Sequence, residues 1–523
     1  MTDETGRRSL SAMALRVLAF LVVTMLATTV FVAQQRGSGA FVAELSAADG
    51  QEARHFVTGL MAAAWARAGF PPLAAFAADT ALHLPAVEPV ARLSLLHGLQ
   101  GAWALLLGPG TPAALLLPAV LAALLAVSAG WAAMRGAGVL AGVAAAFVLS
   151  ALPMLRQATI VIGPDLPLAL FLLLAALASA RHARRGAAGD ALAFLAAGAA
   201  AILTGPAGLC VVLLPPVLVL LAGRFAVLRR WSFWLPLAAL AGLAGLRWGF
   251  ALPAFDAADP RGLWRGLDAA VGTVPLVLGA CGFLFAVKAG WRREASGEAM
   301  AALAALILVY AFELAAGAAS GPLALVPLLA PVVMLAAYGG MGLFGLLTSG
   351  WSIVAGLVVA LVLLLSAMPG LIEPVRKGVI GMDGAAEAFL ARDAGAPAVL
   401  FVAADPAGAA ALVAAVAQRD GARRAFVVPA GRLPAEDPAA LLAALDAMGA
   451  SAVLLEATLA AAALAPNRVA AQTIAAYPDR FRLLGRFPRA DGTGEVRLFA
   501  VTARAPAPAD PAAALRRLAP PPF

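Results

Sequence analysis

The sequence predicts an α-helical polytopic membrane protein with about 11–12 transmembrane or re-entrant helices, followed by a soluble α/β domain. Of its 523 residues 63% are hydrophobic and the mean hydropathy is +0.91, whereas soluble domains contain about 45–50% apolar residues. Apolar stretches close to the ~20 residues that cross a ~30 Å hydrocarbon core recur from Leu15 to about Pro369. Beyond Pro369, short strand-like and helix-like patterns alternate, which indicates an α/β domain. Ala398–Ala403 are strand-like, and Phe481–Phe487 with Glu495–Val501 predict a closing hairpin.

The apolar stretches give the candidate spans in chain order. The first follows a cluster of arginines and lacks a small-residue cleavage site before a soluble domain, so we expect a retained signal anchor. The stretch 94–108 is short, contains His97 and Gln100, and ends in Gly-Pro-Gly. We expect it to be interfacial or re-entrant. The stretches are 17–34, 94–108, 113–133, 137–154, 162–180, 188–204, 206–223, 232–248, 271–289, 299–317, 322–345 and 351–369.

Basic residues in the short loops predict the orientation. Arg181–Arg185, Arg224–Arg230 and Lys288–Arg293 mark the cytoplasmic side by the positive-inside rule. The N-terminus is then cytoplasmic, and the segment 36–93 and everything after Pro369 lie outside, which is the periplasm for a bacterial inner membrane. The same loops account for much of the net charge of +8, so the bilayer is the expected partner and nucleic acid is not.

Three regions follow from these patterns. Residues 1–371 form the transmembrane domain, 372–505 the periplasmic α/β domain, and 506–523 a Pro/Ala-rich tail that we expect to be loosely ordered. Cys210 and Cys281 both lie in apolar spans, so neither a disulfide framework nor a cysteine metal site is expected. The turn Ala403–Gly408 follows a strand but is not a GxGxxG motif, so dinucleotide binding is disfavoured.

The polar segment after the first span carries the strongest functional signal. Residues 51–68 predict an amphipathic helix along the membrane surface, ended by two prolines. Glu52 and His55 are three residues apart and are therefore neighbours on such a helix, with Asp49 just before it. A carboxylate there can take a proton from an acceptor hydroxyl or amine. The alternative is structural: Asp49 caps the helix and Glu52 stabilises its N-terminal end.

A second acidic position lies at the outer start of the span 162–180. Asp165 stands between two Pro-containing pairs, where a carboxylate at membrane depth is either functional or a helix cap. Arg156, just before it, either pairs with Asp165 or holds a phosphate.

These residues together resemble a known family. Glu52-Ala53-Arg54-His55-Phe56-Val57-Thr58-Gly59-Leu60 resembles the first outer loop of bacterial membrane glycosyltransferases of the GT-C superfamily, in the protein O-mannosyltransferase and aminoarabinose transferase branches (glycosyltransferase family 39-like). Gln100, Trp103 and Leu105–Gly108 are similar to the apolar helix that closes that loop, and Gly163–Leu168 resembles the second acidic motif.

The resemblance implies transfer of a sugar from a polyprenyl-phosphate carrier to an acceptor outside the membrane, usually with inversion. The family's Asp-Glu pair falls on Gln51 and Glu52, so Glu52 is the implied base, with Asp49 as the alternate. Asp165 would orient the acceptor or a divalent cation, which is the one cofactor the family suggests. The implied phosphate and substrate contacts are Arg92, in place of the family's lysine, Arg156 and His55.

Because Gln51 replaces the family's aspartate, a second class stays open: a catalytically inactive GT-C-like scaffold that binds a partner or a glycan. A secondary transporter is disfavoured, because the chain shows no internal repeat and few charges within its spans. The sequence leaves the sugar and the acceptor undetermined.

Overall fold

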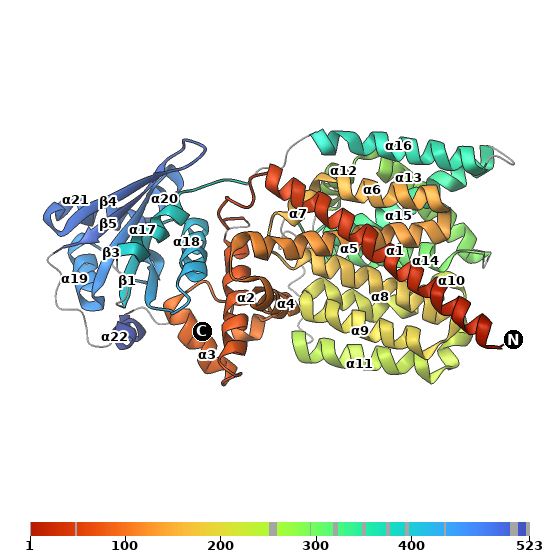
Figure 1. The fold of residues 1–523 in the computed structure, drawn as a ribbon, viewed down its shortest axis with the longest axis horizontal. Helices are drawn as coiled ribbons and strands as arrows, with labels where there is room; N and C mark the ends of the chain where they lie inside the picture. The colour runs from red at the N-terminus through yellow and green to blue at the C-terminus, as the bar shows by residue number, and fades with distance from the viewer. Residues whose placement is uncertain are drawn as a thin grey trace. The chain divides into compact units, whose positions relative to one another are not determined.

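The computed structural model describes residues 2–47, 50–249, 259–292, 294–316, 323–347, 352–372, 377–392, 397–433, 436–502 and 511–518 (Figure 1). Its contacts divide the chain into two compact units. We call Met1–Gly37, Pro118–Ile160 and Pro164–Val375 the helical unit. We call Ser38–Leu117, Val161–Gly163 and Arg376–Phe523 the mixed unit.

Most helices of the helical unit coincide with the predicted apolar stretches, whereas α12 (Pro260–Val271) and η3 (Phe225–Arg229) lie between them. Most helix ends fall within a few residues of the expected bounds. The helices are α1 (Thr2–Gly37), α5 (Thr111–Ala137, in this unit from Pro118), α6 (Val139–Ala151), α7 (Pro153–Thr159), α8 (Asp165–Arg185), α9 (Ala188–Thr204), η2 (Pro206–Leu209), α10 (Cys210–Ala222), η3 (Phe225–Arg229), α11 (Trp231–Trp248), α12 (Pro260–Val271), α13 (Thr273–Trp291), α14 (Gly297–Ala316), α15 (Val326–Leu347) and α16 (Ser352–Ile372).

Six helices in the described part of the chain are long and apolar enough to cross a membrane, and α6 with α7, bent by 61°, adds a seventh if the pair forms one span. Several others are apolar but shorter, so the number of crossings stays a prediction. Large apolar side chains of α1 are exposed, for example Leu15 at 68% and Met25 at 66%. Exposed apolar surface of this kind fits contact with lipid and confirms a multi-pass membrane protein.

The interior of the helical unit is formed by α8 and α15, whose apolar windows are each 78% buried. Helices α13 and α15 approach closely at Gly282 and Gly339. A Cβ at Gly282 would lie 1.9 Å from the carbonyl oxygen of Leu335, so only glycine fits there. Small residues at helix contacts are the usual basis of packing between membrane helices.

The mixed unit combines the polar segment after the first helix with a five-stranded sheet. Its elements are α2 (Gln51–Arg67), α3 (Leu73–His83), η1 (Val90–Arg92), α4 (Leu95–Leu107), α17 (Met382–Arg392), β1 (Ala398–Ala403), α18 (Pro406–Arg419), β2 (Ala425–Pro429), η5 (Ala430–Arg432), α19 (Pro438–Met448), β3 (Ala450–Ala457), α20 (Leu459–Ala463), α21 (Ala465–Ala476), η6 (Pro478–Arg480), β4 (Phe481–Pro488), β5 (Glu495–Val501) and α22 (Pro511–Leu518).

The sheet has the order β2-β1-β3-β5-β4. Strands β2, β1 and β3 are parallel, whereas β5 and β4 form the closing antiparallel hairpin that the sequence predicts. One face of β1, carrying Val399 and Phe401, packs in a core with residues of α19, α21 and α22. Alternate residues of the fully buried strand β1 point to the opposite face. The α/β class of this region is confirmed.

Helix α2 packs against α4 and α18, and much of it is buried, so it is a core helix of the mixed unit. Its position along a membrane surface stays a prediction. Helix α4 has 13 residues, about 20 Å at 1.5 Å per residue, which is shorter than a ~30 Å hydrocarbon core. This length agrees with the expectation that the stretch 94–108 does not cross. Within the Pro/Ala-rich tail, Pro511–Leu518 form a helix in which Ala514 and Leu515 are buried, so that part is ordered by packing.

Candidate functional site

The turn before α2 determines which residue of the Gln51-Glu52 pair faces inward. Gly50 has φ +82°, and a Cβ there would lie 2.7 Å from Cβ of Ala410, so both the backbone and the space require glycine. Gln51 begins the helix and is exposed, whereas Glu52 is 0% exposed. The position where the family carries its aspartate therefore faces outward. Among the described residues at this helix end, Glu52 is the buried carboxylate.

The carboxylate of Glu52 joins three separate segments of the mixed unit. Its Oε1 accepts a hydrogen bond from the backbone N–H of Ile162 at 3.2 Å and forms an ion pair with Nζ of Lys377. Its Oε2 accepts from the backbone N–H of Ala47 at 3.2 Å. The Lys377 side chain is only 6% exposed. A buried carboxylate requires such compensation, because taking an ion out of water is costly.

Opposing effects act on the protonation of Glu52. Burial raises the pKa of the carboxyl above its ordinary value of 4.5, while the charge of Lys377 and the N–H groups of Ile162 and Ala47 oppose that rise. A carboxylate with a raised pKa holds a transferred proton better than an exposed one does. This is the property that a general base working near neutral pH needs.

One turn further along α2, His55 forms a second buried contact. Its Nδ1 lies 3.0 Å from Nε2 of His97, on α4. The backbone N–H of Ser94 donates to Nδ1 of His97 at 2.9 Å, so this nitrogen is an acceptor and Nε2 of His97 carries the proton. Nε2 then donates to Nδ1 of His55, which leaves the proton of His55 on its own Nε2.

This chain of hydrogen bonds disfavours a second proton on His55. A second proton on His55 would have to sit on Nδ1, facing the N–H of His97. Burial, followed by the charge of Arg54, lowers the pKa of His55 to about 4. His55 is therefore a neutral donor through Nε2 over the physiological range, with its orientation fixed by His97 and Ser94.

The other predicted site residues lie in different places. Arg92 is exposed in η1, within the mixed unit. Asp165 is the first residue of α8, and Arg156 lies in the short helix α7; both belong to the helical unit and are partly buried. Asp49 lies outside the described residues.

The structure pairs residues that the sequence did not. Glu52 bonds to Lys377 and His55 to His97, although the helical spacing predicted Glu52 and His55 as neighbours of each other. Lys377 is one of only two lysines in the chain, and its place directly after the last apolar stretch was the available signal. For His97, the one signal in the sequence was a polar residue within an apolar stretch.

The carboxyl edge of the sheet, where ligands often bind in such folds, carries a polar cluster beside β1 and β3. A cavity of about 340 Å³ lies next to it, lined by Ala404 and Ala430, which follow β1 and β2. Glu456, at the end of β3, accepts the backbone N–H of Asp405 at 3.0 Å and a hydrogen bond from Arg489 at 2.9 Å. These groups lie beside the carboxyl ends of β1 and β3, where the order of strands reverses.

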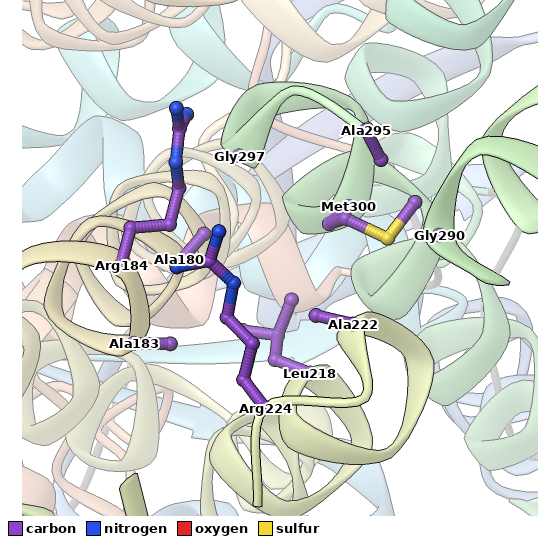
Figure 2. A pocket seen from close by; sticks show the side chains of 10 residues that line it. All are labelled: Ala180, Ala183, Arg184, Leu218, Ala222, Arg224, Gly290, Ala295, Gly297 and Met300. Carbon is purple, nitrogen blue, oxygen red and sulfur yellow. The ribbon is translucent and has the colours of Figure 1, made fainter. Parts of the chain in front are cut away.

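Both units contain cavities of the size that holds a small molecule. The large cavity of the helical unit measures about 430 Å³ and is lined by residues of α12, α13, α14 and α15. Two cavities of the mixed unit measure about 360 and 340 Å³, within the usual range for small-molecule sites, and Arg54 lines the second. Glu52 lines neither of these two. In the helical unit a cavity of about 20 Å³ lies between Arg184 and Arg224 (Figure 2), which is room for about one water. Both arginines belong to the loops expected in the cytoplasm.

A metal site is not apparent among the described residues, in which no three His, Cys, Asp or Glu side chains gather as ligands. Lys377 occupies Oε1 of Glu52, and an ammonium in that position opposes the approach of a second cation. The Glu52 cluster as described therefore does not fit a divalent cation.

A bundle of apolar helices, with a polar unit after the first helix and a carboxy-terminal sheet, defines a polytopic membrane protein with a soluble α/β part. Solved structures of similar fold include membrane glycosyltransferases. ArnT from Cupriavidus metallidurans matches with a TM-score of 0.55 and 15% identity in two states, covering 93% of this chain and 98% of ArnT in the apo state, and 94% and 99% with undecaprenyl phosphate bound.

The oligosaccharyltransferase of Archaeoglobus fulgidus, tethered to an acceptor peptide, matches with a TM-score of 0.53 and 12% identity over 92% of this chain and 74% of that one. No family model matches the chain, and no curated protein matches it in sequence. At these identities the likeness establishes the fold, and the predicted resemblance to the GT-C superfamily is confirmed at that level.

Proposed function

We propose that this protein is a membrane glycosyltransferase that transfers a sugar from a polyprenyl-phosphate carrier to an acceptor on the outer, periplasmic face of a bacterial inner membrane. The observation that supports it most is Glu52. It is a fully buried carboxylate with a raised pKa, at the start of the first helix after the first span, in a chain with the fold of known glycosyltransferases.

In the proposed reaction Glu52 takes the proton of the acceptor hydroxyl or amine as that atom attacks the anomeric carbon of the sugar. The bond between this carbon and the phosphate oxygen breaks, and the carrier phosphate leaves with the bonding electrons. Such a base contributes about 10²–10⁴-fold to the rate. Lys377 has the charge to balance Glu52 before the reaction and to attract the phosphate as it leaves.

The remaining roles rest on the resemblance. Asp165 orients the acceptor, Arg92 or Arg156 holds the carrier phosphate, and His55 donates a hydrogen bond to the substrate through its neutral Nε2–H. The N-terminus is cytoplasmic and the carboxy-terminal α/β domain is periplasmic. One of the two similar ArnT structures has undecaprenyl phosphate bound, which supports a carrier of this chemical class.

A second candidate function is favoured by a specific observation. Both oxygens of Glu52 are engaged, and its carboxylate is closed off from solvent, as expected of a structural tie. On this alternative the protein is a catalytically inactive GT-C-like scaffold that binds a glycan or a partner.

The deciding experiment is transfer in vitro by the purified protein in lipid nanodiscs, with a panel of polyprenyl-phosphate sugars and candidate acceptors. Glu52→Gln should lose transfer by about 10²–10⁴-fold, because the amide accepts no proton. Glu88→Gln, in the same loop but only partly buried, is the matched control and should keep wild-type activity. Full activity of Glu52→Gln would remove Glu52 as the base.

A further inference from the structure

A second buried carboxylate, Glu44, precedes α2 and belongs to none of the motifs above. It is 5% exposed. Its Oε2 accepts the backbone N–H of Ile380 at 2.7 Å, and its Oε1 accepts that of Asp383 at 2.8 Å. Asp383 lies in the first turn of α17, where N–H groups have no partner within the helix and the helix dipole favours a negative charge, and Ile380 lies two residues before the helix. Glu44 therefore fixes the start of α17.

The backbones around Glu44 and before α17 are also joined directly. The N–H of Glu44 donates to the carbonyl of Gly378 at 3.3 Å, and the N–H of Lys377 donates to the carbonyl of Ser38 at 3.4 Å. With the two side-chain bonds of Glu44, these contacts hold the segment 377–383 along the segment 38–44.

The consequence concerns Lys377, whose side chain extends from this segment to Glu52. A lysine has a flexible four-carbon stem, so its ammonium is placed only if its backbone is placed. Neither Lys377 nor Glu52 is easily reached by water to replace a lost partner, since the two side chains are 6% and 0% exposed.

We propose that Glu44 is a positioning residue for the candidate active site: it anchors the segment 377–383 and thereby holds Lys377 against the carboxylate of Glu52. The catalytic meaning of this arrangement rests on the proposed function, whereas the anchoring is tested without it. The test exploits the lysine content, because Lys288 and Lys377 are the only lysines of the chain.

The experiment is amine-reactive labelling of the full-length protein in nanodiscs, with the two lysines read separately by mass spectrometry. Lys288 is exposed and serves as the internal reference. In the wild type Lys377 should be labelled severalfold less than Lys288. Glu44→Gln, which can accept only one of the two N–H bonds through its amide oxygen, should bring Lys377 close to the reference, as should Glu52→Gln. Glu387→Gln, exposed on the same helix α17, should leave Lys377 protected.

Activity provides the second readout. If Glu44 positions Lys377, Glu44→Gln moves the acidic limb of the transfer rate to higher pH, as Lys377→Met does, because the charge of Lys377 lowers the pKa of Glu52. A purely structural role of Glu44 lowers the amount of folded enzyme and leaves the limb at the same pH. Lys377 that stays protected in Glu44→Gln overturns the positioning role. Labelling as expected, together with a wild type that transfers no sugar, overturns the proposed function and leaves the positioning role standing.

A measurement on the unaltered protein covers the case in which Glu44→Gln does not fold. Hydrogen exchange at the amides of Ile380 and Asp383 should be slow, because Glu44 is the acceptor for both. Fast exchange at these two amides contradicts the anchor.

Discussion

Two buried carboxylates of the mixed unit are each paired with one cation, yet their surroundings differ. Glu456 bonds to Arg489, to the backbone N–H of Asp405 and to the hydroxyl of Thr458. Arg489 is 20% exposed and also lies 3.5 Å from Asp491. Glu52 instead meets Lys377, which is 6% exposed, the backbone N–H of the distant Ile162 and that of the nearby Ala47.

The difference indicates different roles. A guanidinium offers several donors in a fixed fork, so the Glu456 pair closes the edge of the sheet as a structural contact. An ammonium is a compact charge with no fixed plane and can exchange one anion for another. The ammonium of Lys377 can therefore exchange Glu52 for another anion. The Arg489–Glu456 ion pair is a structural contact.

The largest effect on stability is expected from removing the cations. Lys377→Met leaves Glu52 buried without its counter-charge and should lower the free energy of unfolding by about 3–5 kcal/mol. Arg489→Met leaves Glu456 with the Asp405 and Thr458 contacts and should cost about 1–3 kcal/mol. Thermal unfolding in detergent, followed by tryptophan fluorescence, measures both. A larger loss for Arg489→Met would reverse the comparison.

The contact between His55 on α2 and His97 on α4 provides a comparison without a buried ion pair. It shows how much of the stability lost in Lys377→Met comes from charge. His97→Leu leaves the N–H of Ser94 and Nδ1 of His55 without their partner and should cost about 1–3 kcal/mol. His97→Gln, whose amide supplies both an acceptor and a donor, should recover part of that loss. Equal losses for the two variants in the same unfolding assay would argue against the assigned ring protons.

The smallest expected effect is a shift of the pH profile. Because burial raises the pKa of Glu52, the acidic limb of the transfer rate should lie above pH 4.5. The charge of Lys377 lowers that pKa, so Lys377→Met should move the limb to still higher pH. Glu456→Gln should leave it in place. Rates measured between pH 4 and pH 8 test this, and a limb unchanged in Lys377→Met would show that Lys377 does not act on the base.

Much of the fold follows from local pattern. The apolar stretch 188–204 became helix α9 with the same bounds, and the strand patterns 398–403 and 495–501 became β1 and β5. Their lengths and residue types set the local conformation, because each element satisfies its backbone hydrogen bonds within itself or with a neighbouring strand. Helix α3 is not among the predicted elements, because the two prolines before it can end one helix as readily as they begin another.

The candidate site was predictable only in part. Glu52 and His55 stand out by their residue type in an apolar chain, and the sequence determined that they lie at the start of one helix. The helical spacing gave the wrong partners, because a helix turns about 100° per residue and the packing around α2 differs on each side. Glu52 meets a lysine 325 residues away, and His55 meets a histidine 42 residues away.

The sequence by itself thus determined a multi-pass membrane protein, its carboxy-terminal α/β fold and the helix that carries Glu52. These depend on hydrophobicity and on residues close in the chain. Tertiary structure alone decided that Gln51 faces outward, that Lys377 compensates Glu52 and that Glu44 bonds to the start of α17. The physical reason is that a buried charge is tolerated only with partners in space, and the chain supplies these from segments whose separation in sequence carries no pattern.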